Sequence, residues 1–386
     1  MMNWEQAIEQ TLTTTRLNVK RFGERFPIVS MGDGKYHLTD HTNWTEGFWP
    51  GILWLSYEYS RDPEIHAAAI QATDSFRQRM LDGQALDHHD IGFLYSLSAK
   101  ARWIADKDEA SRLLALQAAD QLMKRWRPGP QLFQAWGPEG DEDNGGRIII
   151  DCLMNLPLLC WASEQTGDPV YARAARIHAE TSRRFLVRGD DSSYHTFYFD
   201  QQSGDALRGG TAQGYQDGST WTRGQAWGVY GFALAYRSFQ DPHYLETSKR
   251  MARYFVEHLP ADHVAYWDFD APQQEDTPRD SSASAITVCG LLELLEHLPQ
   301  NDPDRDYFSN AVNKSMDSLI NHYFTAGHPS EEGFLRHGSY SVRGNASPDD
   351  FMIWGDYFFL EALLRLARGV PGYWYERGNS ELTNQI

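Results

Sequence analysis

Apolar residues recur along this chain at the spacing of amphipathic helices almost from one end to the other. Period-two alternation, which indicates strands, is confined chiefly to residues 194–200 and 264–269. The pattern predicts helices over residues 3–21, 46–60, 63–80, 90–105, 107–125, 147–165, 168–186, 222–238, 242–258, 281–297, 303–321 and 351–367.

The predicted helices are of two kinds that alternate along the chain. ASRLLALQAADQLMKRW and HYLETSKRMARYFVEHL have a charged face and an apolar face, whereas IGFLYSLSAKARWI and SASAITVCGLLELL are apolar almost all round. An amphipathic helix has one face in solvent, and a helix that is apolar all round is buried. We therefore predict an all-α fold, an (α/α)6 toroid of six outer and six inner helices with short β segments in its loops. A solenoid of helical hairpins is the alternative, but no signature repeats at a fixed period.

The segments that precede the inner helices combine polar groups with Gly or Trp: HTNWTEGFWPG, LDHHDIGF, EDNGGRIIID, DGSTWTRGQAW, PRDSSASA and SPDDFMIWGD. Helix capping explains the Asp, Asn, Ser and Thr of these segments but not their Trp, Arg and His. In a toroid these segments gather at one end, where the long loops 126–146, 187–221, 259–280 and 322–350 also open. We expect the active site at that end.

Composition and charge narrow the function. No linker divides the 386 residues, so we expect a single catalytic domain over residues 1–386. The formal net charge of -18 argues against nucleic acid or an anionic membrane as a partner. The three cysteines lie in apolar stretches without metal or disulfide spacing, and neither a signal peptide nor a membrane span is recognisable. We expect a cytoplasmic protein and a monomer.

Two carboxylates are the main candidates for chemistry. Asp90 stands at the head of the fourth predicted helix, and Asp151 lies one turn into the sixth, after three isoleucines. An apolar setting raises the pKa of a carboxyl group, as acid catalysis near neutrality requires. Each residue also has a structural reading: Asp90 is a plausible N-cap, and Asp151 a plausible partner of Arg147 or Asn155.

Metal chemistry is not expected. His88 and His89 are adjacent and point in different directions on a helix start, and no H-x-x-x-H spacing is present. A G-x-S-x-G elbow, a phosphate loop and a dinucleotide fingerprint are likewise missing from the sequence.

Seven collinear blocks resemble the unsaturated glucuronyl hydrolases, glycoside hydrolase family 88, over nearly the whole chain. They are LDHHDIGFLYSLSAKA, QAWGPEGDEDNGGRIIIDCLMNLPLL, SRRFLVRGDDSSYHTFYFD, DGSTWTRGQAWGVYGFAL, YWDFDAPQ, RDSSASAIT, and SPDDFMIWGDYFFLEALLRL with GYWYERG. The resemblance implies an (α/α)6 enzyme without metal or cofactor. Its substrate would be the oligosaccharide that a polysaccharide lyase leaves with an unsaturated uronic acid at the non-reducing end.

The same resemblance implies roles for particular residues. Asp151 matches the general acid/base that protonates C4 of the C4=C5 double bond and activates water for attack at C5. Asp90 matches the second essential carboxylate. The positions that match substrate contacts are Trp44, His89, Trp136, His195, Gln213, Arg223 and Trp227. The structural alternatives are packing for the tryptophans and an ion pair with Asp217 for Arg223.

Other functions remain open at this stage. An unsaturated rhamnogalacturonyl hydrolase acting on pectin fragments would use the same fold and chemistry. A sugar epimerase would need a histidine acid/base pair, and a noncatalytic sugar-binding protein would need no buried carboxylate. The loop 340–350 holds Arg343 and no lysine, which favours substrates with little or no sulfate.

Overall fold

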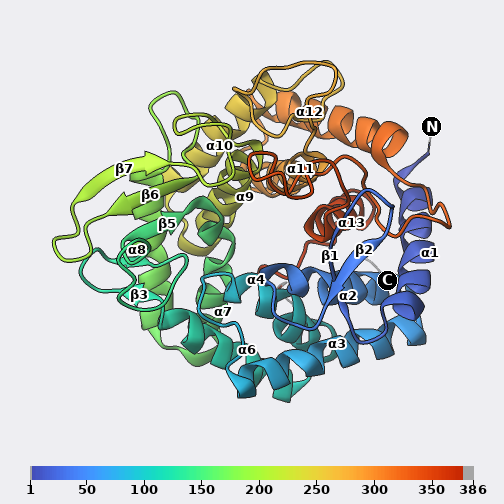
Figure 1. The fold of residues 1–386 in the computed structure, drawn as a ribbon, viewed down its shortest axis with the longest axis horizontal. Coiled ribbons are helices and arrows are strands. Elements are labelled where there is room, and N and C mark those ends of the chain that lie inside the picture. Colours follow the sequence, from blue (N-terminus) through green and yellow to red (C-terminus); the bar gives the residue numbers. More distant parts are fainter. Residues whose placement is uncertain (1, 377–386) are drawn as a thin grey trace.

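The computed structural model describes residues 2–376, which form two concentric rings of helices (Figure 1). The outer helices are α1 (Trp4–Phe22), α3 (Pro63–Asp82), α6 (Glu109–Met123), α8 (Pro169–Phe185), α10 (Pro242–Glu257) and α12 (Arg305–Ser318). The inner helices are α2 (Phe48–Ser60), α4 (Ile91–Tyr95) with α5 (Ala101–Asp106), α7 (Leu156–Thr166), α9 (Thr222–Phe239), α11 (Ser281–His297) and α13 (Ile353–Arg368). The predicted (α/α)6 toroid is confirmed.

The inner ring is closed. Each inner helix contacts the next one along the chain, and α13 returns to contact both α2 and α1. One cluster of buried apolar side chains runs from Ala7 to Trp374 and includes residues of every inner helix. The helices that were predicted from their all-apolar sequences are therefore those that the outer ring covers.

Local sequence determines where the outer helices begin. Asp62, Asp168 and Asp241 each precede a proline, and each carboxylate accepts a hydrogen bond from a backbone N–H of the first turn. Proline at the first helical position loses no helical hydrogen bond, and the preceding carboxylate satisfies a free donor. Asp-Pro therefore starts three outer helices directly after the inner helix before each of them.

The connections differ greatly between the two ends of the toroid. Only residues 61–62, 107–108, 167–168 and 240–241 link the first four inner helices to the outer helices that follow them. At the other end the connections are long, such as 186–221 between α8 and α9 and 258–280 between α10 and α11. These long connections leave room for a functional site only at the end where the inner helices begin.

The prediction of a continuous helix over residues 147–165 is wrong at its start. Arg147–Ile149 forms strand β5, Ile150–Met154 forms a 3-10 turn, and helix α7 begins only at Leu156. β-Branched side chains favour extended backbone, and β5 pairs with β6 (Thr196–Phe199), which pairs in turn with β7 (Ala206–Gly210). Asp151 therefore stands on a turn between a strand and a helix.

The structure confirms one of the two predicted strands and not the other. Residues 194–200 contain β6, whereas residues 264–269 form only isolated bridges, Trp221 with Asp268 and Tyr266 with Arg279. The backbone of Trp267 instead bonds to Thr222 and Pro278 in neighbouring loops. Two short hairpins were not predicted: β1 (Phe26–Ser30) with β2 (Tyr36–Thr39), and β3 (Trp126–Arg127) with β4 (Leu132–Phe133).

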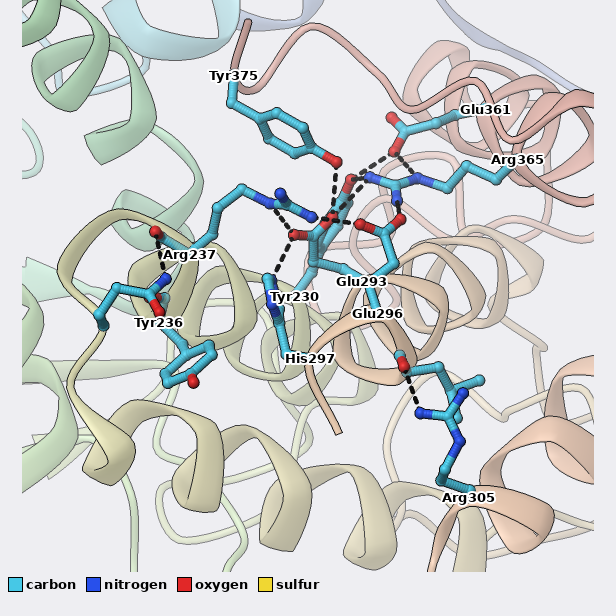
Figure 2. Close-up of polar contacts among 12 residues, drawn as sticks. Tyr230, Tyr236, Arg237, Glu293, Glu296, His297, Arg305, Glu361, Arg365 and Tyr375 are labelled. Atoms are coloured by element: carbon cyan, nitrogen blue, oxygen red, sulfur yellow. Dashed lines mark hydrogen bonds and ion pairs between the residues drawn. The ribbon is translucent and has the colours of Figure 1, made fainter. Parts of the chain in front are cut away.

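Charged side chains converge at the end of the toroid where α9, α11 and α13 finish (Figure 2). Arg365 donates to Glu361 at 3.1 Å and to Glu293 at 3.0 Å, and Arg237 donates to Glu293 at 2.5 Å. Tyr230 donates to Glu361 at 2.5 Å. The carboxylates of Glu293 and Glu361 are fully buried, so these pairs join three inner helices.

We predict that Arg365→Met destabilises the protein by about 3–5 kcal/mol, because it leaves two buried carboxylates without their shared cation. The measurement is the urea dependence of unfolding. Arg368→Met is the matched control one turn later, since Arg368 is exposed and pairs with exposed Glu5 at 3.0 Å. Equal midpoints for the two variants would contradict the structural importance of the buried pairs.

Candidate active site

Two turns from different helical pairs bring Asp90 and Asp151 together. Asp90 immediately precedes α4, and Asp151 lies in the 3-10 turn between β5 and α7. Gly92 packs directly on this turn: a Cβ at Gly92 would lie 2.4 Å from the Cα of Asn155. Only glycine permits this approach of the two backbones.

Asp151 has the environment of a proton donor. Its Oδ1 atom is buried and has no hydrogen-bond partner among residues 2–376. Burial, and then the negative charge of Asp90, raise the pKa of Asp151 to about 8, whereas Arg223 and Arg147 act in the opposite direction. The side chain is therefore neutral near pH 7 and can give up its proton to a bound molecule.

Asp90 has the opposite character. Burial raises its pKa, but the neighbouring His89, His88 and Asn155 outweigh burial and leave the pKa of Asp90 lower than usual. His88 Nδ1 and His89 Nε2 lie 3.4 Å from its two carboxylate oxygens. Asp90 makes no side-chain capping bond to α4 in the described structure, so the N-cap alternative fails. The site thus pairs an ionised carboxylate with a protonated one.

Two buried histidines present imidazole nitrogens that are free of hydrogen bonds within the described chain: both nitrogens of His89, and Nε2 of His195. The Nδ1 atom of His195 accepts from the backbone N–H of Ala212 at 3.0 Å, so its Nε2 carries the proton. Burial lowers the pKa of His89 to about 4. Burial, reinforced by Arg147 and Arg223, also lowers the pKa of His195. Both rings are neutral, and the Nε2 donor of His195 has no acceptor among residues 2–376.

The loop that carries Gln213 is held by buried hydrogen bonds. Asp268 accepts from the backbone N–H of Tyr215 at 2.9 Å and from the hydroxyl of Ser219 at 2.7 Å. Gln213 donates through its side chain to the carbonyl of Tyr340 at 2.9 Å. This bond joins the 211–219 loop to the 340–350 loop.

Arg223 is 1% exposed and pairs with Asp280 at 2.5 Å, not with Asp217 as the structural alternative supposed. It also donates to the carbonyl of Tyr340 at 2.8 Å. Asp217 instead accepts from the backbone of Thr211, because the loop turns it toward solvent. A substrate contact by Arg223 stays a prediction.

The three candidate tryptophans occupy different environments. Trp44 is half-buried and stacks on Trp354, with ring centroids 5.5 Å apart. Trp136 is also half-buried and lies under the guanidinium of Arg147 at 4.4 Å. Trp227 is 1% exposed and packs against Phe93 and Phe358, the packing role that we set beside the binding role. Contact of these three tryptophans with substrate stays a prediction.

Some residues that surround the site were not predicted from the sequence. Arg147 lies between Trp136 and Tyr198, its cross-strand neighbour, and acts on the pKa of Asp151. Trp354 and Asp280 orient Trp44 and Arg223. The sequence indicated Arg147 only as a possible partner of Asp151, and it indicated Trp354 and Asp280 only by their position near the start of inner helices, which many other residues share.

A protonated carboxyl beside an ionised one, with half-buried aromatic rings nearby, suits acid/base chemistry on a carbohydrate. The toroid and this pair define the class as a carbohydrate-active (α/α)6 enzyme. The model of Glycosyl Hydrolase Family 88 matches residues 18–359, and the chain belongs to that family, so it is a glycoside hydrolase.

Similar proteins agree with this assignment. The crystal structure of an unsaturated glucuronyl hydrolase from a Bacillus species is 61% identical, covers 97% of this chain and 100% of its own, and superimposes with a TM-score of 0.96. An unsaturated chondroitin disaccharide hydrolase of Streptococcus pyogenes is 44% identical over 96% of this chain and 92% of its own. A mutant unsaturated glucuronyl hydrolase of Streptococcus agalactiae, complexed with dGlcA-GalNAc6S, is 40% identical with a TM-score of 0.85, over 96% of this chain and 93% of its own.

Residues 2–376 contain neither a cluster of metal ligands nor a membrane-spanning helix. No group of three or more His, Cys, Asp or Glu side chains in that range could hold a metal ion. Nor does any helix there have the length and apolar character needed to cross a membrane.

We predict that Gly92→Ala lowers kcat/KM more than tenfold and destabilises the protein by about 1–3 kcal/mol, since the new methyl group forces the two carboxylate-bearing turns apart. The measurements are steady-state kinetics and urea denaturation. The control is Gly189→Ala, where an added Cβ meets no described atom within 4 Å. Unchanged kinetics in Gly92→Ala would show that the close approach is not needed.

Proposed function

We propose that this enzyme removes the unsaturated glucuronic acid from the non-reducing end of oligosaccharides that lyases release from glycosaminoglycans or bacterial polysaccharides. The observation that carries the proposal is the pair Asp90 and Asp151, whose pKa values are shifted in opposite directions. Family membership and the names of the similar proteins support the substrate class.

The proposed reaction is hydration of an enol ether. The Asp151 carboxyl group transfers its proton to C4 of the C4=C5 bond, and a cation with oxocarbenium character develops at C5. The ionised Asp90 stabilises this cation electrostatically. Water then attacks C5 and gives a proton to the Asp151 carboxylate, which restores the acid. The product is a hemiketal that opens and releases the remaining sugar chain.

The remaining candidate residues have proposed roles in binding. Trp44 and Trp136 supply aromatic surfaces for sugar rings, and Trp227 is a further proposed substrate contact. His89, His195 and Gln213 offer polar groups to the sugar hydroxyls. For Arg223, whose guanidinium is already paired with Asp280, we propose a contact to the substrate carboxylate through its remaining N–H groups.

We further propose a monomeric, cytoplasmic enzyme with one catalytic domain that needs no metal or cofactor. The three cysteines are unpaired and buried, as is usual in a reducing compartment. Gel filtration tests the monomer, and EDTA in the assay tests metal independence.

The decisive assay follows the ultraviolet absorbance of the C4=C5 bond of unsaturated disaccharides from hyaluronan, chondroitin and pectin, with EDTA present. We expect rapid loss of absorbance with the hyaluronan and chondroitin disaccharides. Loss with the pectin fragment alone would indicate rhamnogalacturonyl hydrolase activity instead. Unchanged absorbance with all three would indicate an epimerase or a binding protein.

We predict that Asp151→Asn lowers kcat by about 10²–10⁴-fold, the usual contribution of general acid/base catalysis, while substrate binding remains. The wild-type rate should fall as the pH rises through about 8, because Asp151 then loses the proton that it must donate. Rates measured between pH 4 and 10, with calorimetric titration of substrate, test both statements. Asp306→Asn, exposed on α12, is the control. Turnover retained by Asp151→Asn would remove this residue from the acid/base role.

We also propose a preference for unsulfated or lightly sulfated substrates. Arg343 is the one cation of the 340–350 loop, and its side chain is exposed. A single exposed cation is weak recognition for a sulfate ester. The comparison is kcat/KM for unsulfated against sulfated chondroitin disaccharides, and a clear preference for the sulfated substrates would overturn the proposal.

A further inference from the structure

The side-chain amide of Asn155 lies between the two carboxylate-bearing turns and is fully buried. Its Oδ1 atom accepts a hydrogen bond of 2.7 Å from the backbone N–H of Phe93, in the first turn of α4. This bond determines which way the amide faces, because only the oxygen can accept from an N–H. The Nδ2 group is therefore turned away from Phe93.

The Nδ2 group carries the two N–H donors of the amide. One donates to the backbone carbonyl of Asp151 at 3.3 Å. The amide also lies close enough to Asp90 to lower the pKa of its carboxyl group. One amide thus bonds to the backbone of α4 and to the backbone of the Asp151 turn, and it acts on the charge of Asp90.

We propose that Asn155 is a positioning residue for the reaction, which orients the Asp90 carboxylate toward the substrate and fixes its spacing from Asp151 through hydrogen bonds to both turns. This role rests on the proposed function. Asn155 does not touch the reacting atoms, and its effect reaches them through the two aspartates.

The charge state of Asp90 depends on few neighbours. His88 and His89 face it from its own segment, and Asn155 and Asp151 face it from the turn before α7. The pKa of His89 is about 4, so this ring is neutral at the pH of catalysis. The amide of Asn155 also lowers the pKa of Asp90, and an amide does not titrate between pH 4 and 10.

Two replacements should move the pH dependence of kcat in opposite directions. Asn155→Leu removes the amide that lowers the pKa of Asp90, so the acid limb should shift to higher pH by about one to two pH units, the size of one polar interaction with a charged group. The basic limb should stay, because Asp90 is still ionised where Asp151 titrates. Asn155→Asp keeps the shape and the acceptor for Phe93. Near neutrality its kcat should fall at least tenfold, and activity should recover toward lower pH as the new carboxyl group gains a proton and becomes a donor again.

The experiment measures kcat between pH 4 and 10 for wild type, Asn155→Leu, Asn155→Asp and the control Asn313→Asp, which changes an exposed residue of α12. Circular dichroism and thermal unfolding verify the fold of each variant. If Asn155→Leu does not fold, the proposal is tested by whether the activity of Asn155→Asp recovers at lower pH. If the Asn155 variants keep the acid and basic limbs of the wild-type pH profile and show only a uniform loss of kcat, the role of Asn155 is purely structural and the proposal is overturned.

A separate readout distinguishes this proposal from the proposed function. If wild type consumes none of the unsaturated disaccharides, the proposed function fails. The pKa of Asp90 is then followed by carboxyl carbon-13 NMR, with its signal assigned by its loss in Asp90→Asn. A higher pKa of Asp90 in Asn155→Leu than in wild type would still support the positioning role, and an equal pKa would refute it.

Discussion

The site depends on the close approach of two backbone turns that each carry a carboxyl group. Two carboxyl groups in a poorly solvated site cannot both ionise without a large electrostatic cost, so one of them keeps its proton. The environment decides which one. Asp90 has two histidines and an amide donor beside it, whereas the buried oxygen of Asp151 lacks a hydrogen-bond partner among residues 2–376. The contact of Gly92 with Asn155 keeps the pair close enough for this asymmetry to persist.

The architecture explains how so costly a pair is tolerated. The short turns and the buried pairs of Arg365 and Arg237 with glutamates join the inner helices at the end away from the site. The side chains at the end with long connections then need not stabilise the fold and can serve the reaction. Histidine nitrogens without a hydrogen-bond partner in the described part of the chain, and a raised carboxyl pKa, are departures from local stability that such a scaffold supports.

Much of the fold was predictable because its signals are local. Asp-Pro starts three outer helices, and the outer helix over Pro63–Asp82 was predicted within two residues at its end. The start of the sixth helical segment was not, because a short run of isoleucines fits a buried strand as well as a buried helix. Its strand character comes from pairing with residues 196–198, which is a tertiary contact.

The predictability of the site follows the same division. Asp90 and Asp151 could be singled out because each stands at the start of an inner helix, and the resemblance gave them roles. The partner of Arg223 could not be predicted from the sequence. Asp280 lies 57 residues away, and only the packing of α9 against α11 brings the two side chains together. Asn155 was visible in the sequence merely as a neighbour of Asp151. Its contact with Phe93, 62 residues earlier, turns the amide toward both carboxylate segments, so its importance lies in an orientation that only the folded chain defines.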